Sequence, residues 1–200
     1  MRLRLIGLAL TIAGATALLA PNLAQAGTSV TSPAAGSQLQ SALTSASLSL
    51  RAPQSTSVPP QLQPPAGNSL SAVFIGSGVQ IYQCGNGAWS LLEPAAQLAG
   101  AAVPGGAFRT AIHFRGPSWE STQDGSLVQG SPVASQPVAG AIPELLLKAT
   151  SNRGDGTFGR VSYIQRLATK GGVAPAGACA DGQTIAVPYS AKYRFFAPAT

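Results

Sequence analysis

The sequence predicts a single all-β domain, either an antiparallel sandwich or a barrel, with at most one or two short helices. Hydrophobic residues make up 45% of the 200 residues, which is enough to build a core. Only 9% of the residues are charged, too few for disorder driven by charge repulsion. The 23 glycines and 16 prolines separate short runs of alternating polarity, a pattern that favours strands and turns over long helices.

The N-terminus has the three parts of a secretory signal peptide. Arg2 and Arg4 give it a positive start, residues 5–19 are mainly apolar, and Ala24-Gln25-Ala26 matches the small-x-small cleavage pattern. We therefore expect cleavage after Ala26 and export to the periplasm or out of the cell. A retained N-terminal anchor is the alternative, and no membrane span is expected after cleavage.

The mature chain is expected to have two parts. Residues 27–57 are rich in Ser, Ala and Gln and contain no aromatic residue, which predicts a flexible leader. The β domain is expected over residues 58–200, beginning with a stiff, extended proline-rich segment over 58–65. The formal net charge is +6, but the basic residues are scattered and do not alternate with aromatic ones. We therefore expect no nucleic-acid partner.

Strand-like runs then follow one another towards the C-terminus. They cover residues 70–75, 79–84, 88–92, 108–114, 126–129, 158–169, 184–188 and 191–196. Gly76-Ser77-Gly78 is expected to break the first run from the second, and Gly85-Asn86-Gly87 is a strong hairpin signal. Residues 93–102 have helical propensity, residues 133–141 read as a loop, and residues 142–149 suit either a helix or a strand.

Alternation over residues 108–114 separates two faces. Thr110, Ile112 and Phe114 share one face, while Arg109, Ala111 and His113 share the other. If Ile112 and Phe114 face the core, His113 points outward or into a cleft beside Arg109.

Cys84 and Cys179 are the only cysteines. In an exported protein such a pair is most simply one disulfide, closing a loop of roughly 95 residues. A metal-binding or redox pair is the alternative, but there is no CxxC spacing and a single histidine leaves too few soft ligands. We expect no metal and no cofactor.

The stretch 113–130 contains the only histidine, one tryptophan and two of the six acids. The candidate polar site consists of His113, Glu120, Asp124, Arg109 and Arg115. Histidine can act as a base near neutral pH, and a neighbouring carboxylate would orient it and raise its pKa. Two carboxylates could also serve glycoside cleavage.

A structural interpretation of the same residues stays open. His113 would then be solvated, Asp124 would cap the turn at Gly125, and Glu120 would pair with Arg115 or Arg109. The chain also has a candidate aromatic surface for sugars, formed by Tyr82, Trp89 and Trp119, although aromatic residues at strand spacing more often belong to the core.

Several phrases in this order resemble the DUF3455 family of exported proteins of unknown function. They are Gly78-Val-Gln-Ile-Tyr-Gln-Cys84, His113 with Gly116-Pro-Ser-Trp-Glu120, Asp124-Gly-Ser126, Ile142-Pro-x-Leu-Leu-Leu147, Tyr163-Ile-Gln-Arg166, Thr169-Lys-Gly-Gly172 and Val187-Pro-Tyr-Ser-Ala191. The resemblance covers about residues 58–196 and implies no established activity. Glu144 departs from the family pattern, which usually has Trp after Ile-Pro, and this suggests an exposed or subfamily-specific position.

Three functions are compatible with these patterns. The first is an exported domain that binds an unknown extracytoplasmic or cell-envelope ligand, such as a saccharide. The second is a hydrolase or metal-assisted enzyme that uses His113 with Glu120 or Asp124. The third is a structural or protein-interaction module. We favour the first. An open aromatic groove would support it, a closed pocket with His113 beside a carboxylate would support the second, and a flat apolar patch would support the third.

Overall fold

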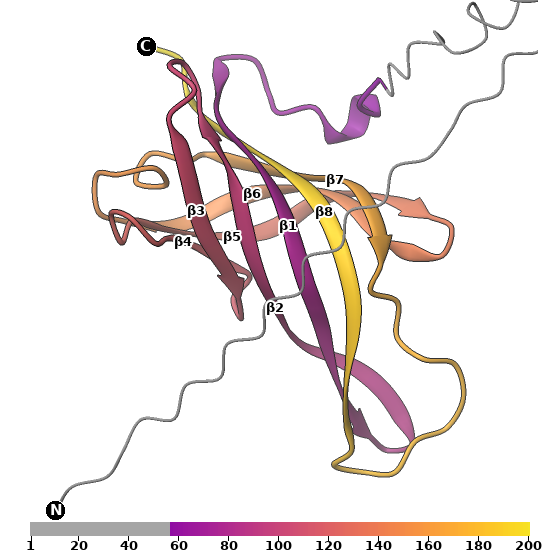
Figure 1. Cartoon of the computed structure of the whole chain (residues 1–200). Coiled ribbons are helices and arrows are strands. Elements are labelled where there is room, and N and C mark those ends of the chain that lie inside the picture. The colour runs from indigo at the N-terminus through magenta and orange to yellow at the C-terminus, as the bar shows by residue number, and fades with distance from the viewer. Residues whose placement is uncertain (1–56) are drawn as a thin grey trace, which may run out of the picture. The chain divides into compact units, whose positions relative to one another are not determined.

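The computed structural model describes residues 57–200, which form one antiparallel sheet of eight strands closed into a barrel (Figure 1). The strands are β1 (Asn68–Gly85), β2 (Ala88–Ala102), β3 (Phe108–Phe114), β4 (Ser118–Ser121), β5 (Leu127–Val138), β6 (Ala141–Arg153), β7 (Tyr163–Gly171) and β8 (Thr184–Pro198). Each strand pairs with the next, and β8 closes the ring against β1. The predicted all-β class is confirmed, in its barrel form. The predicted signal peptide, and the predicted leader up to residue 56, lie outside the described residues.

The up-and-down strand order places alternate connections at the two ends of the barrel. The β1–β2, β3–β4, β5–β6 and β7–β8 connections share one end, which we call the disulfide end, and the remaining connections lie at the opposite end. Asn86 and Gly87 make the β1–β2 turn with φ values of 54° and 73°, as the sequence predicts.

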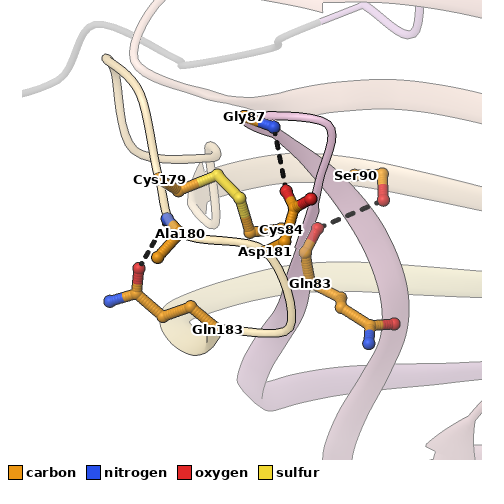
Figure 2. The surroundings of a disulfide bond; sticks show 8 residues. All are labelled: Gln83, Cys84, Gly87, Ser90, Cys179, Ala180, Asp181 and Gln183. Atoms are coloured by element: carbon orange, nitrogen blue, oxygen red, sulfur yellow. Dashed lines mark hydrogen bonds between the residues drawn. A yellow bond between two sulfur atoms is a disulfide. The ribbon is translucent and has the colours of Figure 1, made fainter.

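The disulfide between Cys84 and Cys179 is confirmed, with a Cα–Cα distance of 5.9 Å. It ties the end of β1 to the long loop before β8, as Figure 2 shows. In the same region an oxygen of Asp181 accepts a hydrogen bond from the backbone nitrogen of Gly87 at 3.1 Å. The loop is therefore fastened to the β1–β2 turn by a covalent bond and a polar contact.

The predicted break at Gly76-Ser77-Gly78 is wrong, because β1 runs without interruption through both glycines. A Cβ atom at Gly76 would meet the Tyr193 ring at 2.8 Å, and one at Gly78 would meet the Ala95 carbonyl oxygen at 2.2 Å. Glycine stands here because neighbouring strands and an inward ring come too close for any side chain.

Three other local predictions also need correction. The predicted helix over residues 93–102 is the second half of β2, where Ala96 and Leu98 point into the barrel. The predicted loop over residues 133–141 is mostly β5, and the strand predicted from residue 158 begins only at Tyr163. Pairing with β1 and β3 on both sides of β2 outweighs its helical propensity.

Aromatic rings fill much of the barrel interior. Phe158, from the loop between β6 and β7, packs on Phe195 at 4.6 Å and on Phe74 at 5.7 Å between ring centroids. Trp119 and Tyr193 extend this cluster, with centroids 5.8 Å apart. All five rings are almost fully buried, so the part of the interior next to the β6–β7 loop is closed by side chains.

The chain before β1 covers part of the outer surface. The 3-10 turn η1 (Pro60–Leu62) interrupts the segment that was predicted to be extended. It places Leu62 against Leu146 and Leu167, on the outside of β6 and β7. Within residues 57–200 there is no helix of the length and apolar character that a membrane crossing needs.

Candidate functional site

A cavity of about 370 Å³ lies among the strands near the disulfide end of the barrel. Its apolar lining comes mainly from Leu91, Leu92, Pro94, Pro132, Leu145 and Leu147. Its polar lining comes from Gln80, Glu93, His113, Arg115 and Arg166. The volume falls in the range of small-molecule sites, which are typically about 300–1,000 Å³, apolar, and supplied with few polar groups.

His113 faces the inside of the barrel, opposite to the expectation that Ile112 and Phe114 face the core. The alternation on β3 is as predicted, but Ala111 and His113 are buried and Ile112 is 41% exposed. The His113 ring stacks on Trp119 with centroids 4.3 Å apart and planes 5° from parallel. Small Ala111 and flat His113 fit the space beside the aromatic core, so this face turns inward. Trp119 is buried.

The imidazole of His113 is neutral at physiological pH. Burial lowers its pKa to about 4, a hydrogen bond to Ser118 opposes this shift, and the charge of Arg166 adds to it. Nδ1 lies 2.8 Å from the carbonyl oxygen of Ser118, which can only accept, so Nδ1 carries the proton and donates it. Nε2 is then left as a hydrogen-bond acceptor. The predicted increase in this pKa is wrong, because no ion pair with a carboxylate forms at His113 in the described part of the chain.

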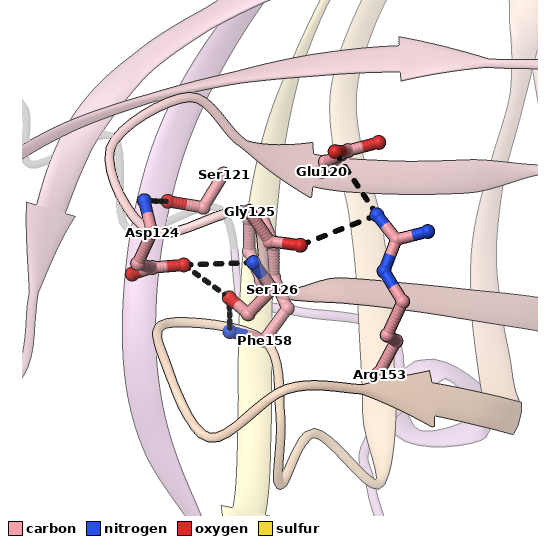
Figure 3. Close-up of polar contacts among 7 residues, drawn as sticks. All are labelled: Glu120, Ser121, Asp124, Gly125, Ser126, Arg153 and Phe158. Atoms are coloured by element: carbon pink, nitrogen blue, oxygen red, sulfur yellow. Dashed lines mark hydrogen bonds and ion pairs between the residues drawn. The ribbon is translucent and has the colours of Figure 1, made fainter.

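Glu120 lies on the face of β4 opposite to the buried Trp119. It forms an ion pair with Arg153 at 3.0 Å, as Figure 3 shows. The predicted pairing of Glu120 with Arg115 or Arg109 is therefore wrong. Arg115 instead pairs with Glu93 at 3.3 Å on the lining of the cavity. Arg109 donates to the carbonyl oxygen of its neighbour Phe108.

Asp124 holds two loops together at the opposite end of the barrel. One carboxylate oxygen accepts from the backbone nitrogen and hydroxyl of Ser126, at 2.9 and 2.6 Å. The other accepts from the backbone nitrogen and hydroxyl of Thr157, at 3.0 and 2.8 Å. Desolvation raises the pKa of Asp124, but these four hydrogen bonds outweigh it and hold the pKa well below its usual value. The hydroxyl of Ser126 also accepts from the backbone nitrogen of Phe158 (Figure 3).

The structure thus separates the predicted polar group. Of its five members, His113 and Arg115 line the cavity, whereas Glu120, Asp124 and Arg109 do not. The three residues of the predicted aromatic surface are separated too. Trp119 and Tyr82 are buried, and the Tyr82 hydroxyl donates to the carbonyl oxygen of Gly172 at 2.6 Å, while Trp89 lies half-buried near the β1–β2 turn.

Sequence reasoning missed three polar residues of the cavity, Gln80, Glu93 and Arg166. Gln80 is 1% exposed and faces inward from the middle of β1. Arg166 sits opposite Tyr193 in the β7–β8 pairing, where alternation directs it to the lumen. Arg166 lies two positions after Ile164 and therefore on the same face of β7, which was the available signal. The sequence alone does not show that this face, rather than the other, points into the barrel.

Together the fold and the cavity define a closed antiparallel barrel with a mainly apolar pocket that contains a few polar groups. The chain belongs to the DUF3455 family, described as a protein of unknown function, whose model matches residues 65–197. No curated protein and no solved structure matches the chain. The side chain of Glu144, which was expected to be exposed or specific to a subfamily, is half-buried, and its carboxylate accepts from the backbone nitrogen of Ala168 at 2.6 Å.

Proposed function

We propose that this protein is an exported binding protein that takes up a small, mainly apolar molecule in the cavity of the barrel. The observation that carries the proposal is the cavity itself, about 370 Å³ in volume and lined largely by leucines and prolines. Transfer of an apolar molecule from water to such a surface is favourable by about 25 cal/mol for each Å² removed from water.

The lining favours a hydrophobic ligand over the saccharide that the sequence suggested. Sugar sites usually offer an open aromatic face, but the rings of Trp119 and Tyr82 are buried. The hydrolase alternative has less support, because its three residues do not meet. His113 lines the cavity, Glu120 pairs with Arg153 on the outer face of β4, and Asp124 binds Thr157 at the opposite end of the barrel. The predicted signal peptide and the disulfide support a location outside the cytoplasm, since disulfides persist in oxidising compartments.

The test is saturable binding of N-phenyl-1-naphthylamine, a neutral apolar dye, followed by its fluorescence in the purified protein. We expect Leu145→Trp to weaken dye binding by at least about tenfold. Leu145 lines the cavity, and the bulky indole ring of tryptophan would fill part of the space that the dye needs. Val133→Trp is the matched control, since Val133 is exposed on β5 and does not line the cavity. The absence of saturable dye binding, or equal loss in both variants, would overturn the proposal.

A further inference from the structure

Arg166 is a partly buried cation in the lumen with a neutral internal partner. Its Nε and Nη2 donate to the carbonyl oxygen of Pro143 at 3.1 and 2.9 Å. Guanidinium has five N–H donors, so these two bonds leave donors free. Burial lowers the pKa of Arg166, with the nearby phenols of Tyr193 and Tyr189 opposing the shift, but an arginine remains charged at neutral pH.

The chain supplies no carboxylate to balance this charge. All six acidic residues lie within residues 57–200, and five of them bind other groups. These five are Glu93, Glu120, Asp124, Glu144 and Asp181. The sixth, Asp155, is exposed in the loop between β6 and β7, at the opposite end of the barrel. Because Glu93 and Arg115 neutralise each other, the cavity has one net positive charge, that of Arg166.

Two further donors on the same cavity lack partners. Gln80 Nε2 and Trp119 Nε1 are buried, and neither makes a hydrogen bond of good geometry among residues 57–200. The Tyr189 hydroxyl is the acceptor nearest in kind for Gln80, since a contact with Gln80 partly opposes the rise of the Tyr189 pKa, but the two groups do not reach hydrogen-bond geometry. Both residues are 1% exposed and both line the cavity. A buried donor left unpaired costs about 1–3 kcal/mol, so two of them on one cavity indicate that a ligand provides the acceptors.

We infer that the ligand carries a carboxylate on an apolar body, as a medium-chain carboxylic acid does. This inference rests on the proposed binding function and specifies the chemistry of the ligand. The carboxylate takes hydrogen bonds from Arg166 and from the unpaired amide of Gln80, while the apolar body lies against the leucines and prolines of the lining. Charge-assisted bonds from a guanidinium to a carboxylate are among the strongest that proteins form.

The experiment measures displacement of bound N-phenyl-1-naphthylamine by decanoate and by methyl decanoate, which has the same apolar body without the charge. In the unmodified protein we expect decanoate to bind at least about tenfold more tightly than the ester. Arg166→Gln should reduce this preference, measured as the ratio of the two affinities in the same variant, to within about twofold. Lys192→Gln removes a positive charge from the outer face of β8 and should keep the full preference.

A second variant guards against a folding defect in Arg166→Gln. Gln80→Leu removes one buried donor and should lower the affinity for decanoate more than that for the ester, because a bond to the charged carboxylate is stronger than one to the ester carbonyl. Equal binding of decanoate and ester by the unmodified protein, or a preference that survives Arg166→Gln, would overturn the inference while dye binding still supports the cavity. Failure of the dye itself to bind would instead overturn the proposed function.

Discussion

His113 makes the stability of the barrel depend on pH. Its pKa in the folded protein is about 4, below the value of 6.5 for a free histidine, mainly because burial disfavours the charged ring. Between these two values the unfolded chain binds a proton that the folded chain does not. Stability therefore falls as the pH is lowered from about 6.5 to about 4, with a slope of up to about 1.4 kcal/mol per pH unit.

Urea unfolding between pH 4 and pH 7.5 checks this prediction by comparison with His113→Gln. The amide can still donate to the carbonyl oxygen of Ser118, but it does not titrate. The free energy of unfolding of the variant should change less steeply with pH than that of the unmodified protein, whatever the absolute stability of the variant. Equal slopes in the two proteins would show that His113 is not the titrating group.

At the scale of elements, Asp124 joins the β4–β5 turn to the loop between β6 and β7. Asp124→Ala leaves the donors of Ser126 and Thr157 without their acceptor, so the free energy of unfolding should drop by about 1–3 kcal/mol. Because the pKa of Asp124 is lowered by folding, this contribution is present above pH 3.8 and fades as the pH falls further.

The matched control for this variant is Asp155→Ala, in the same loop. Asp155 is exposed, and its carboxylate makes no ion pair or side-chain hydrogen bond within residues 57–200. Chemical unfolding at pH 7 should therefore show little change for Asp155→Ala. A similar loss in both variants would mean that the network around Asp124 adds nothing specific.

At the scale of the whole molecule, the disulfide stabilises the fold by lowering the conformational entropy of the unfolded chain. Cys84 and Cys179 are 95 residues apart, and closing a loop of this length is worth on the order of 4–5 kcal/mol in the chain-entropy model. The double variant Cys84→Ser with Cys179→Ser should unfold at a lower urea concentration, and reductant should move the unmodified protein to a similar midpoint. The variant itself should not respond to reductant. An unmodified protein whose midpoint ignores reductant would contradict the prediction.

The sequence by itself determined the features that depend on near neighbours or on residue counts. Alternating polarity and frequent Gly and Pro predict the all-β class, and Asn86-Gly87 predicts the first turn. Two cysteines in a chain with a predicted signal peptide predict one disulfide. These signals are local, or depend on the number of cysteines alone.

Only the tertiary structure decided which side of β3 faces inward and what each polar group binds. Both faces of β3 carry apolar residues, so alternation defines the two sides without choosing between them. Closure of the ring turns Ala111 and His113 inward, and it keeps β2 extended and β1 continuous through its glycines. Glu120 with Arg153, Asp124 with Thr157, and Arg166 beside Tyr193 are each separated by more than 25 positions. Such contacts arise only once neighbouring strands have paired, and for that reason the cavity and its unbalanced positive charge were not visible in the sequence.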